Sequence, residues 1–252
     1  MKKRKALIAG NWKMHTTVVD GCRLALDVAQ TCSGLTDREV LVAPPYTILS
    51  EVAHVLASTD VMVASQNVCW ADKGAFTGEI SPVMVKDAGG TAALIGHSER
   101  RQIFGETDEL INARVKGGLA FGLLTILCIG ETLAERESGK AFEVLSRQLH
   151  RGLASLTPAD MANVVIAYEP VWAIGTGKTA SKEQAQEAHA FIRGVLVKIF
   201  EKTVAEHTRI LYGGSVKPTN IDELMAQPDI DGVLVGGAAL DAESFGRIIN
   251  FR

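Results

Sequence analysis

The chain has 252 residues, of which 47% are apolar, and its composition does not change along its length. This predicts one large globular domain over residues 1–252 in place of two small ones. The formal charge is −3, so the chain has no overall positive field for nucleic acid or an acidic membrane surface. No stretch approaches the roughly 20 apolar residues of a membrane helix, and the widely separated cysteines favour reduced thiols, so we expect a cytoplasmic protein.

Short apolar runs rich in β-branched residues recur along the chain, with helical patterns between them. Because these runs are continuously apolar and do not alternate, they predict strands buried on both faces, as parallel strands are. The eight predicted strands are residues 6–9, 40–43, 61–64, 92–95, 124–129, 164–167, 210–212 and 232–235.

The segments between these strands carry the start signals and apolar spacing of helices. Ser181 and Gln184 form a capping box before a stripe of apolar residues at steps of three and four. Ser81 followed by Pro82 has the order that starts a helix, and residues 142–156 repeat the apolar spacing. Eight strand–helix units in about 250 residues predict a closed (β/α)₈ barrel, because an open doubly wound sheet usually stops at about five to seven strands.

Polar side chains and glycines directly follow most of the predicted strands. In a closed barrel the C-terminal ends of the strands meet at one rim, where barrel enzymes have their active sites. We therefore expect a shared site formed by Asn11 and Lys13 after the first strand, Gln66 and Asn67 after the third, His97 and Glu99 after the fourth, Glu169 after the sixth, Gly213, Gly214 and Ser215 after the seventh, and Gly236 and Gly237 after the eighth.

Glu169 lies at the tip of an apolar strand, where a carboxylate is desolvated enough to act as a general base. A salt-bridged structural glutamate is the alternative. Residues 170–180 favour the base, because they form a connection longer than ordinary strand–helix loops and have an apolar tip. We predict that this segment is a lid that closes over a charged intermediate and excludes water.

His97 and Lys13 are the candidates for stabilising charge during the reaction. A helical turn that starts after His97 disfavours added positive charge, so we predict a neutral imidazole that donates a hydrogen bond to a carbonyl oxygen. Lys13 is the cation of the first strand-end segment and the natural partner for developing negative charge. The alternatives are a core histidine with satisfied hydrogen bonds and a solvated surface lysine.

The glycines after the seventh and eighth strands predict a phosphate site. Glycine pairs offer bare backbone N–H groups, and a short helix beginning near Gly237 would point its positive end at the same place. Closure of the lid would add the amide of Gly175. Tight-turn glycines are the alternative for each loop alone, but two such pairs on adjacent strands favour a phosphate cradle, where barrels commonly have one.

These residues occur within motifs that closely resemble those of the triosephosphate isomerase family. The motifs are GNWKM at residues 10–14, GAFTGE at 74–79, GHSERR at 96–101, AYEPVWAIGTG at 167–177, YGGSV at 212–216 and VGGA at 235–238. The resemblance implies a TIM barrel that interconverts dihydroxyacetone phosphate and glyceraldehyde 3-phosphate through an enediolate. It also implies that Glu169 moves the proton, that His97 acts as a neutral electrophile, and that Asn11 with Lys13 stabilises the oxyanion.

The resemblance extends to binding and assembly. It implies that Glu99 orients Lys13, and that a homodimer forms in which the loop around Thr77 inserts into the partner and supports Asn11 and Lys13. It implies a small triose phosphate as the substrate, with no metal and no cofactor. The backbone amides implied to hold the phosphate are those of Gly175, Ser215, Gly236 and Gly237.

Two positions depart from the family's pattern. His15 stands where asparagine is common, and Ala239 stands where serine is common. Neither position has one of the roles named above, although Ala239 removes a side chain that could support the phosphate site.

Three other functions stay open. Residues 175–180 fit the dinucleotide pattern G-x-G-x-x-A and end like a P-loop, but Trp172 stands where a P-loop needs glycine. His97 and Glu99 fit the H-x-E of a zinc hydrolase, but no P-C-x-x-C accompanies them. The third alternative is a barrel that binds a small phosphorylated ligand without catalysis.

Overall fold

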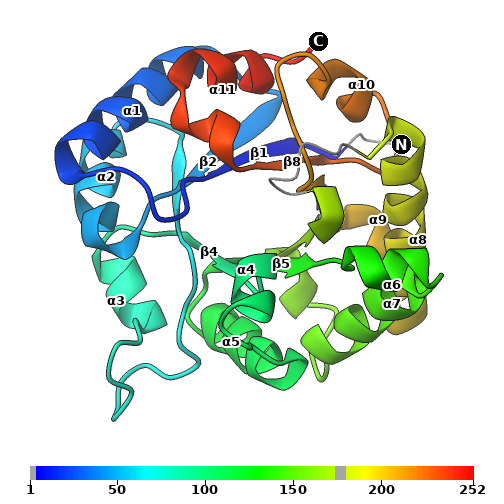
Figure 1. Ribbon diagram of the computed structural model, residues 1–252. Coiled ribbons are helices and arrows are strands. Elements are labelled where there is room, and N and C mark those ends of the chain that lie inside the picture. The colour runs from blue at the N-terminus through cyan, green and yellow to red at the C-terminus, as the bar shows by residue number, and fades with distance from the viewer. Residues whose placement is uncertain (1–3, 174–179) are drawn as a thin grey trace.

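The structure is a computed structural model that describes residues 4–173 and 180–252. Within these residues, parallel strands pair in chain order and close into a barrel, because β8 pairs back with β1 (Figure 1). This confirms the predicted closed (β/α)₈ barrel. The strands are β1 (Ala6–Asn11), β2 (Arg38–Ala43), β3 (Met62–Ser65), β4 (Ala92–Ile95), β5 (Leu124–Ile129), β6 (Val164–Tyr168), β7 (Arg209–Tyr212) and β8 (Gly232–Val235).

Helices surround the barrel and cover the outer faces of the strands (Figure 1). Ser81 caps α3 and Ser181 caps α8 with the predicted capping box. The α-helices are α1 (Val18–Thr31), α2 (Leu49–Leu56), α3 (Pro82–Asp87), α4 (Ser98–Gln102), α5 (Asp108–Ala120), α6 (Leu133–Glu137), α7 (Ala141–Gly152), α8 (Lys182–Phe200), α9 (Lys202–His207), α10 (Ile221–Met225) and α11 (Ala242–Ile249). The 3₁₀ turns are η1 (Tyr46–Ile48), η2 (Asp160–Asn163), η3 (Val171–Ala173) and η4 (Gly237–Leu240).

The core has two layers, because successive side chains of each strand point to opposite faces. The outer layer fills the space between strands and helices, and it includes Ile8, Ile95 and Ile166. The inner layer fills the barrel itself and is rich in alanine, since eight strands leave little room inside. Its buried residues are Leu7, Ala9, Leu41, Ala43, Ala64, Ala92, Leu94, Ile126, Cys128, Val165, Ala167, Leu211 and Leu234.

Several element boundaries differ from those predicted. β1 continues to Asn11, because Gly10 and Asn11 stay in register with Val42 and Ala43 of β2. The apolar spacing of residues 142–156 outlasts its helix, since α7 ends at Gly152. The predicted lid includes residues 174–179, which lie outside the described part of the chain.

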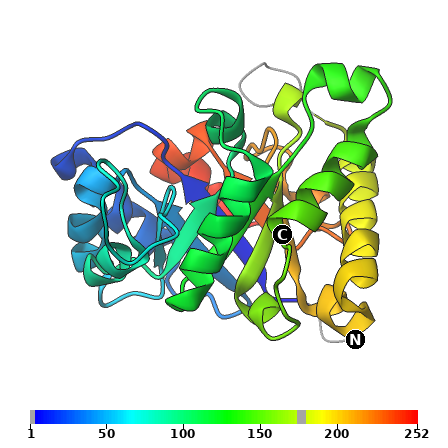
Figure 2. The ribbon, with the colours of Figure 1, turned by 90° about the horizontal axis from the view of Figure 1, so that it is seen from below.

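The strands share one direction, so their C-terminal ends lie on the same side of the molecule. In Figure 2, which shows the barrel from the side, β1 (dark blue) runs upwards from the lower part of the view. The loop between β3 and α3 projects away from the barrel wall (Figure 1). In the described residues, no helix combines the length and apolar character needed to cross a membrane.

Candidate active site

On β1 and β6, the residue two positions after the last inward-facing apolar residue points into the barrel mouth. Side chains of a strand alternate with a period of two. Ala9 faces inward, so the next inward position is Asn11. Ala167 also faces inward, so the next inward position on that strand is Glu169. Register alone therefore directs an amide and a carboxylate into the barrel mouth.

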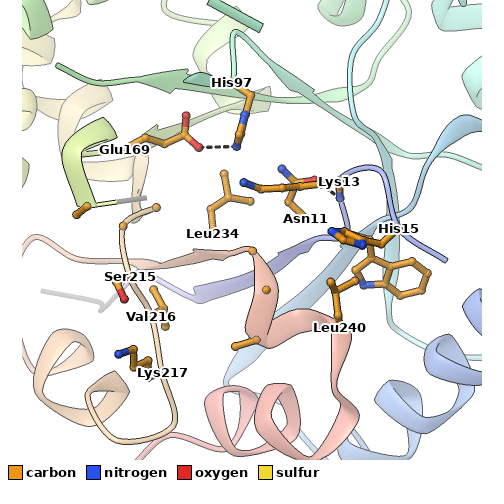
Figure 3. Close-up of a pocket in the computed structure, with 17 residues that line it drawn as sticks. Asn11, Lys13, His15, His97, Glu169, Ser215, Val216, Lys217, Leu234 and Leu240 are labelled. Atoms are coloured by element: carbon orange, nitrogen blue, oxygen red, sulfur yellow. Dashed lines mark hydrogen bonds and ion pairs between the residues drawn. The ribbon is translucent and has the colours of Figure 1, made fainter. Parts of the chain in front are cut away.

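A cavity of about 590 Å³ opens at this mouth (Figure 3). Its lining includes nine of the residues predicted at the strand ends, whereas Gln66, Asn67 and Glu99 do not line it. The lining residues are Asn11, Trp12, Lys13, His15, His97, Glu169, Ala173, Gly213, Gly214, Ser215, Val216, Lys217, Leu234, Gly236, Gly237, Ala238 and Leu240. Leu234 and Lys217 were not predicted, because neither a leucine within a strand nor a lone loop lysine carries a specific signal. Gly175 lies outside the described residues.

Glu169 is only 2% exposed and faces the cavity from the end of β6 (Figure 3). Its Oε2 accepts a hydrogen bond from the backbone N–H of Ser98 at 2.9 Å, and its Oε1 lies 3.0 Å from Nε2 of His97. The backbone N–H of Glu169 donates to the carbonyl of Ile129 at 2.7 Å. A carboxylate that is so far removed from bulk water, and so firmly placed, is suited to take a proton from a bound substrate.

His97 is the N-cap residue of α4, and two hydrogen bonds define its ring. Nδ1 accepts the backbone N–H of Glu99 at 3.2 Å, which requires an unprotonated Nδ1. The proton of the ring is then on Nε2 and points to Glu169, as in a neutral imidazole. Burial lowers the pKa of His97, but the charge and hydrogen bond of Glu169 and the charge of Glu99 raise it further than burial lowers it. The helix N-terminus alone predicts a lowered pKa for His97. The carboxylates of Glu169 and Glu99 reverse that direction.

Lys13 has a left-handed backbone with φ of 52°, which is uncommon for a residue with a side chain. Its N–H donates to Oδ1 of Asn11 at 3.0 Å, and its carbonyl accepts Nε2 of Gln66 at 2.7 Å. Nζ of Lys13 lies 2.6 Å from Oε1 of Glu99. Burial raises the pKa of Glu99, but the hydrogen bond from Lys13 and the charges of His97 and Lys13 outweigh burial and lower it. These contacts hold the ammonium group at the cavity (Figure 3).

Glycine backbone forms the opposite side of the cavity, together with Ser215. A Cβ atom at Gly236 would lie 3.5 Å from Cε of Lys13, and one at Gly237 would meet nothing within 4 Å. The lysine therefore passes beside exposed main chain. The predicted short helix near Gly237 is the four-residue 3₁₀ turn η4, in which Ala239 donates to the carbonyl of Gly236 at 2.8 Å.

Thr77 lies outside the cavity, on the exposed loop between β3 and α3. The base of this loop is closed by the N–H of Cys69, which donates to the carbonyl of Ile80 at 2.8 Å. Glu79 accepts two hydrogen bonds of 2.7 Å each from the buried guanidinium of Arg114. The loop is thus anchored at its base while Thr77 projects from the molecule.

Glu131 is a second buried carboxylate that the sequence reasoning missed. It is fully buried and accepts hydrogen bonds from the hydroxyl of Tyr168 at 3.1 Å and the indole of Trp172 at 2.8 Å. Arg136 lies 3.2 Å from the same Oε1. The signal was present in the sequence, because Glu131 follows β5 by two residues, yet that strand end was not considered.

The H-x-E segment, His97 to Glu99, is the candidate ligand pair of the alternative zinc site. In the structure His97 contacts Glu169, and Glu99 contacts Lys13. Among residues 4–173 and 180–252, no group of three or more His, Cys, Asp or Glu side chains is arranged to hold a metal ion. The segment is engaged in the hydrogen-bond network of the cavity.

The fold and the site define a (β/α)₈ barrel whose mouth holds the groups that acid–base chemistry uses. A buried carboxylate, an imidazole and an ammonium group share one cavity with exposed glycine backbone, at the rim where such barrels have their active sites.

Comparisons with known proteins identify the family. The sequence profile of the family described as triosephosphate isomerase matches residues 6–252. The chain is 54% identical to the triosephosphate isomerase of Geobacter metallireducens, with 99% of each chain covered, and 52% identical to that of Herpetosiphon aurantiacus, with 99% of this chain and 100% of the relative covered. The crystal structure of triosephosphate isomerase from Bartonella henselae superposes with a TM-score of 0.89 at 38% identity, covering 98% of each chain. The chain belongs to the triosephosphate isomerase family.

Proposed function

We propose that this isomerase interconverts dihydroxyacetone phosphate and D-glyceraldehyde 3-phosphate by proton transfer through an enediolate. The observation that carries the proposal is the convergence of Glu169, His97 and Lys13 on one cavity that has glycine backbone on its other side. A carboxylate base, a hydrogen-bond donor and a cation are the groups that deprotonation next to a carbonyl needs. The name shared by the relatives supports a triose phosphate as the substrate.

In the proposed reaction, Glu169 takes a proton from one substrate carbon and returns it to the neighbouring carbon, while the hydroxyl proton of the first carbon's oxygen is replaced by one on the former carbonyl oxygen, with His97 giving and taking the oxygen-bound proton. To reach the substrate, the carboxylate leaves the N–H of Ser98 and Nε2 of His97, which it contacts in the structure. Departure of the carboxylate frees the Nε2 proton for the substrate oxygen. It also removes the negative charge that raises the pKa of His97, so the ring donates as a neutral imidazole.

Lys13 and Asn11 stabilise the enediolate oxygen in this proposal. The ammonium group of Lys13 is held beside the cavity by Glu99 at 2.6 Å, which orients it without contacting the substrate. Asn11 fixes the backbone of Lys13 through the hydrogen bond at 3.0 Å. Because both groups are in place before the substrate arrives, they stabilise charge at little reorganisation cost.

We further propose that the backbone amides of Ser215, Gly236 and Gly237 bind the phosphate. Glycine at two of these positions lets an anion approach the main chain closely, and Lys13 lies beside Gly236. The contribution of Gly175 stays a prediction from the sequence.

The reaction class in this proposal is that of an aldose–ketose isomerase, an intramolecular oxidoreductase that needs no cofactor. The hydrogen leaves and returns as a proton, so the substrate itself balances the oxidation of one carbon with the reduction of the next. We expect full activity after dialysis against EDTA. Loss of activity that returns on addition of a divalent metal would contradict cofactor independence.

We propose that the protein works as a homodimer through the loop around Thr77. Exposed apolar side chains support this assembly: Met14 is 92% exposed beside Lys13, and Trp70 and Phe76 are 37% and 38% exposed on the loop of Thr77. Apolar groups gathered on a protein surface favour association. Sedimentation at micromolar concentration should give twice the chain mass, and a monomer would refute the proposal.

We also propose that residues 1–252 form a single catalytic domain that works in the cytoplasm. The first and last strands pair with each other, so removal of either end opens the barrel. The four cysteines are free thiols, as suits a reducing compartment. A single cooperative transition in calorimetry is expected, and two separate transitions would argue against one domain.

The substitution Glu169→Gln tests the proposed base. The amide keeps the shape of the side chain but cannot take the proton, so we expect turnover of glyceraldehyde 3-phosphate to fall by about 10²–10⁴-fold, with ligand binding largely kept. Glu187→Gln, which makes the same change on an exposed residue of α8, is the control. Near-normal turnover of Glu169→Gln in the coupled assay would refute the role, and absence of activity in the unmodified chain would favour a binding protein.

A further inference from the structure

A second lysine, Lys217, stands at the rim of the active-site cavity. It lies in the loop after β7, two residues beyond Ser215, and it lines the same cavity while being exposed to solvent. Figure 3 shows it next to Val216, on the Ser215 side of the mouth. It is therefore placed at the side of the cavity where the phosphate is proposed to bind.

Among the residues that the structure describes, the formal charges of Lys13, Glu99 and Glu169 do not together attract an anion to the cavity. Lys13 is paired with Glu99 at 2.6 Å, so these two charges largely cancel for an approaching ligand. Glu169 adds a negative charge, which leaves a sum of −1 for the three groups. The whole chain carries −3. Among the described side chains at the mouth, Lys217 is therefore the source of long-range attraction for a phosphate dianion.

The structure leaves the charge of Lys217 available. Within the described residues, its ammonium group forms no ion pair and no hydrogen bond. The backbone is held in place instead: its N–H donates to Oδ1 of Asn220 at 2.8 Å, and Nδ2 of Asn220 donates to the carbonyl of Ser215 at 3.0 Å. Asn220 thereby holds the backbone of Lys217 and the backbone of Ser215, where the phosphate is proposed to bind.

We infer that Lys217 is an electrostatic steering residue, which attracts the phosphorylated substrate to the cavity mouth and does not take part in the proton transfer. The inference rests on the proposed function, since it assumes that a phosphate-bearing substrate enters here. A long-range charge raises the rate of encounter with an oppositely charged ligand, and this effect weakens as salt screens it.

The expected size follows from Coulomb's law. One charge about 10 Å from a dianion in water, screened as in 0.01 M salt, changes the local concentration of the anion about threefold. At 0.15 M salt the same charge gives only about 1.5-fold. Lys217→Gln should therefore lower kcat/KM by about threefold at 0.01 M NaCl, and Lys217→Glu by about the square of that factor.

The experiment measures kcat and kcat/KM for glyceraldehyde 3-phosphate from 0.01 to 0.15 M NaCl. Lys198→Gln and Lys198→Glu are matched controls, because Lys198 is exposed on the distant half of α8 and makes the same change in total charge. Steering predicts a loss in kcat/KM that follows the charge at position 217, shrinks with salt and leaves kcat within about twofold. A loss equal to that of the Lys198 variants, or one independent of salt, overturns the inference.

Two further measurements separate steering from a structural role. Unphosphorylated glyceraldehyde carries no charge, so its slow isomerisation, followed by NMR, should be the same in the Lys217 variants and the unmodified chain. An equal loss for both substrates overturns steering. In calorimetry at low salt, the affinity for inorganic phosphate should fall from the unmodified chain to Lys217→Gln and again to Lys217→Glu. This measurement can be made even if the chain has no isomerase activity. Inactivity would refute the proposed function alone, whereas unchanged phosphate affinity would refute the role of Lys217 alone.

Discussion

The substitution Gly130→Ala tests how the barrel wall places the proposed base. Gly130 follows β5 at the next inward position after Cys128, and a Cβ atom there would lie 1.7 Å from the carbonyl oxygen of Glu169 and 2.7 Å from its carbonyl carbon. Gly130 cannot easily retreat, because its N–H donates to Oε1 of Gln148 at 2.8 Å and its carbonyl accepts Nε2 of Gln148 at 3.1 Å. Gln148 is itself buried, so we expect the main chain of Glu169 to move instead.

The size of the movement sets the expected loss. The contact has to lengthen from 1.7 Å to at least 3.0 Å, which is a displacement of 1.3 Å at Glu169. A misplacement of about 1 Å in a catalytic group costs about 10²-fold in rate. We therefore expect kcat/KM to fall by about 10²-fold or more, together with a loss of about 1–3 kcal/mol in the free energy of unfolding from overpacking.

The assay is the coupled turnover of glyceraldehyde 3-phosphate, with urea denaturation of the same samples. Gly194→Ala is the matched control, because a Cβ atom there meets nothing within 4 Å and alanine should stabilise α8 by about 0.5–1 kcal/mol. If Gly130→Ala folds and keeps the turnover of the unmodified chain, the position of Glu169 does not depend on this glycine and the reasoning fails.

Two predictions concern the groups around α8. Burial lowers the pKa of His189 to about 3, so this ring stays neutral in the folded chain while the unfolded ring takes a proton below about pH 6.5. The neutral ring therefore stabilises the folded chain less as the pH falls. Between pH 7 and pH 5, the free energy of unfolding measured with urea should fall by about 2 kcal/mol more in the unmodified chain than in His189→Gln. Equal losses in the two chains would contradict this linkage. Arg193, whose side chain is 12% exposed, lies 2.6 Å from Asp229 and 2.7 Å from Asp231. Arg193→Met should therefore lower the free energy of unfolding by about 3–5 kcal/mol, and a loss below about 1 kcal/mol would show that the network contributes little.

The fold was predictable because buried parallel strands leave a local signal. Strands β4, β5 and β8 match the predicted ranges, since each is a continuous apolar run that ends at glycine or a polar residue. Helix ends were harder to predict. Leu153 and Leu156 continue the apolar spacing of α7 although the helix stops at Gly152, because the chain after the helix packs on the same core. Apolar spacing indicates which residues are buried, and buried residues continue beyond the end of the helix, so the spacing does not mark where α7 ends.

Nine of the residues predicted at the strand ends line the cavity and Gln66, Asn67 and Glu99 do not, while the contacts between these side chains were harder to predict. The rule that strand ends form the mouth identified Asn11, Lys13, His97 and Glu169 as neighbours. It could not show that Glu169 lies 3.0 Å from His97, and that contact reverses the direction expected for the pKa of the imidazole. Such contacts depend on distances across the barrel, which no spacing along the chain contains.

Glu131 and Glu169 show which structural fact decides between two buried glutamates. Both follow a buried strand, and both are at most 2% exposed. The inward-facing residues of β5 are Ile126 and Cys128, so Glu131 has the opposite parity and points to the outer layer, where Tyr168 and Trp172 bind its carboxylate. On β6 the inward parity includes Glu169. Glu169 lines the cavity, whereas Glu131 lies among Tyr168, Trp172 and Arg136 and is not part of the cavity lining. Knowing which residues of a strand face inward therefore separates a candidate base from a structural anchor, even where composition and burial are the same.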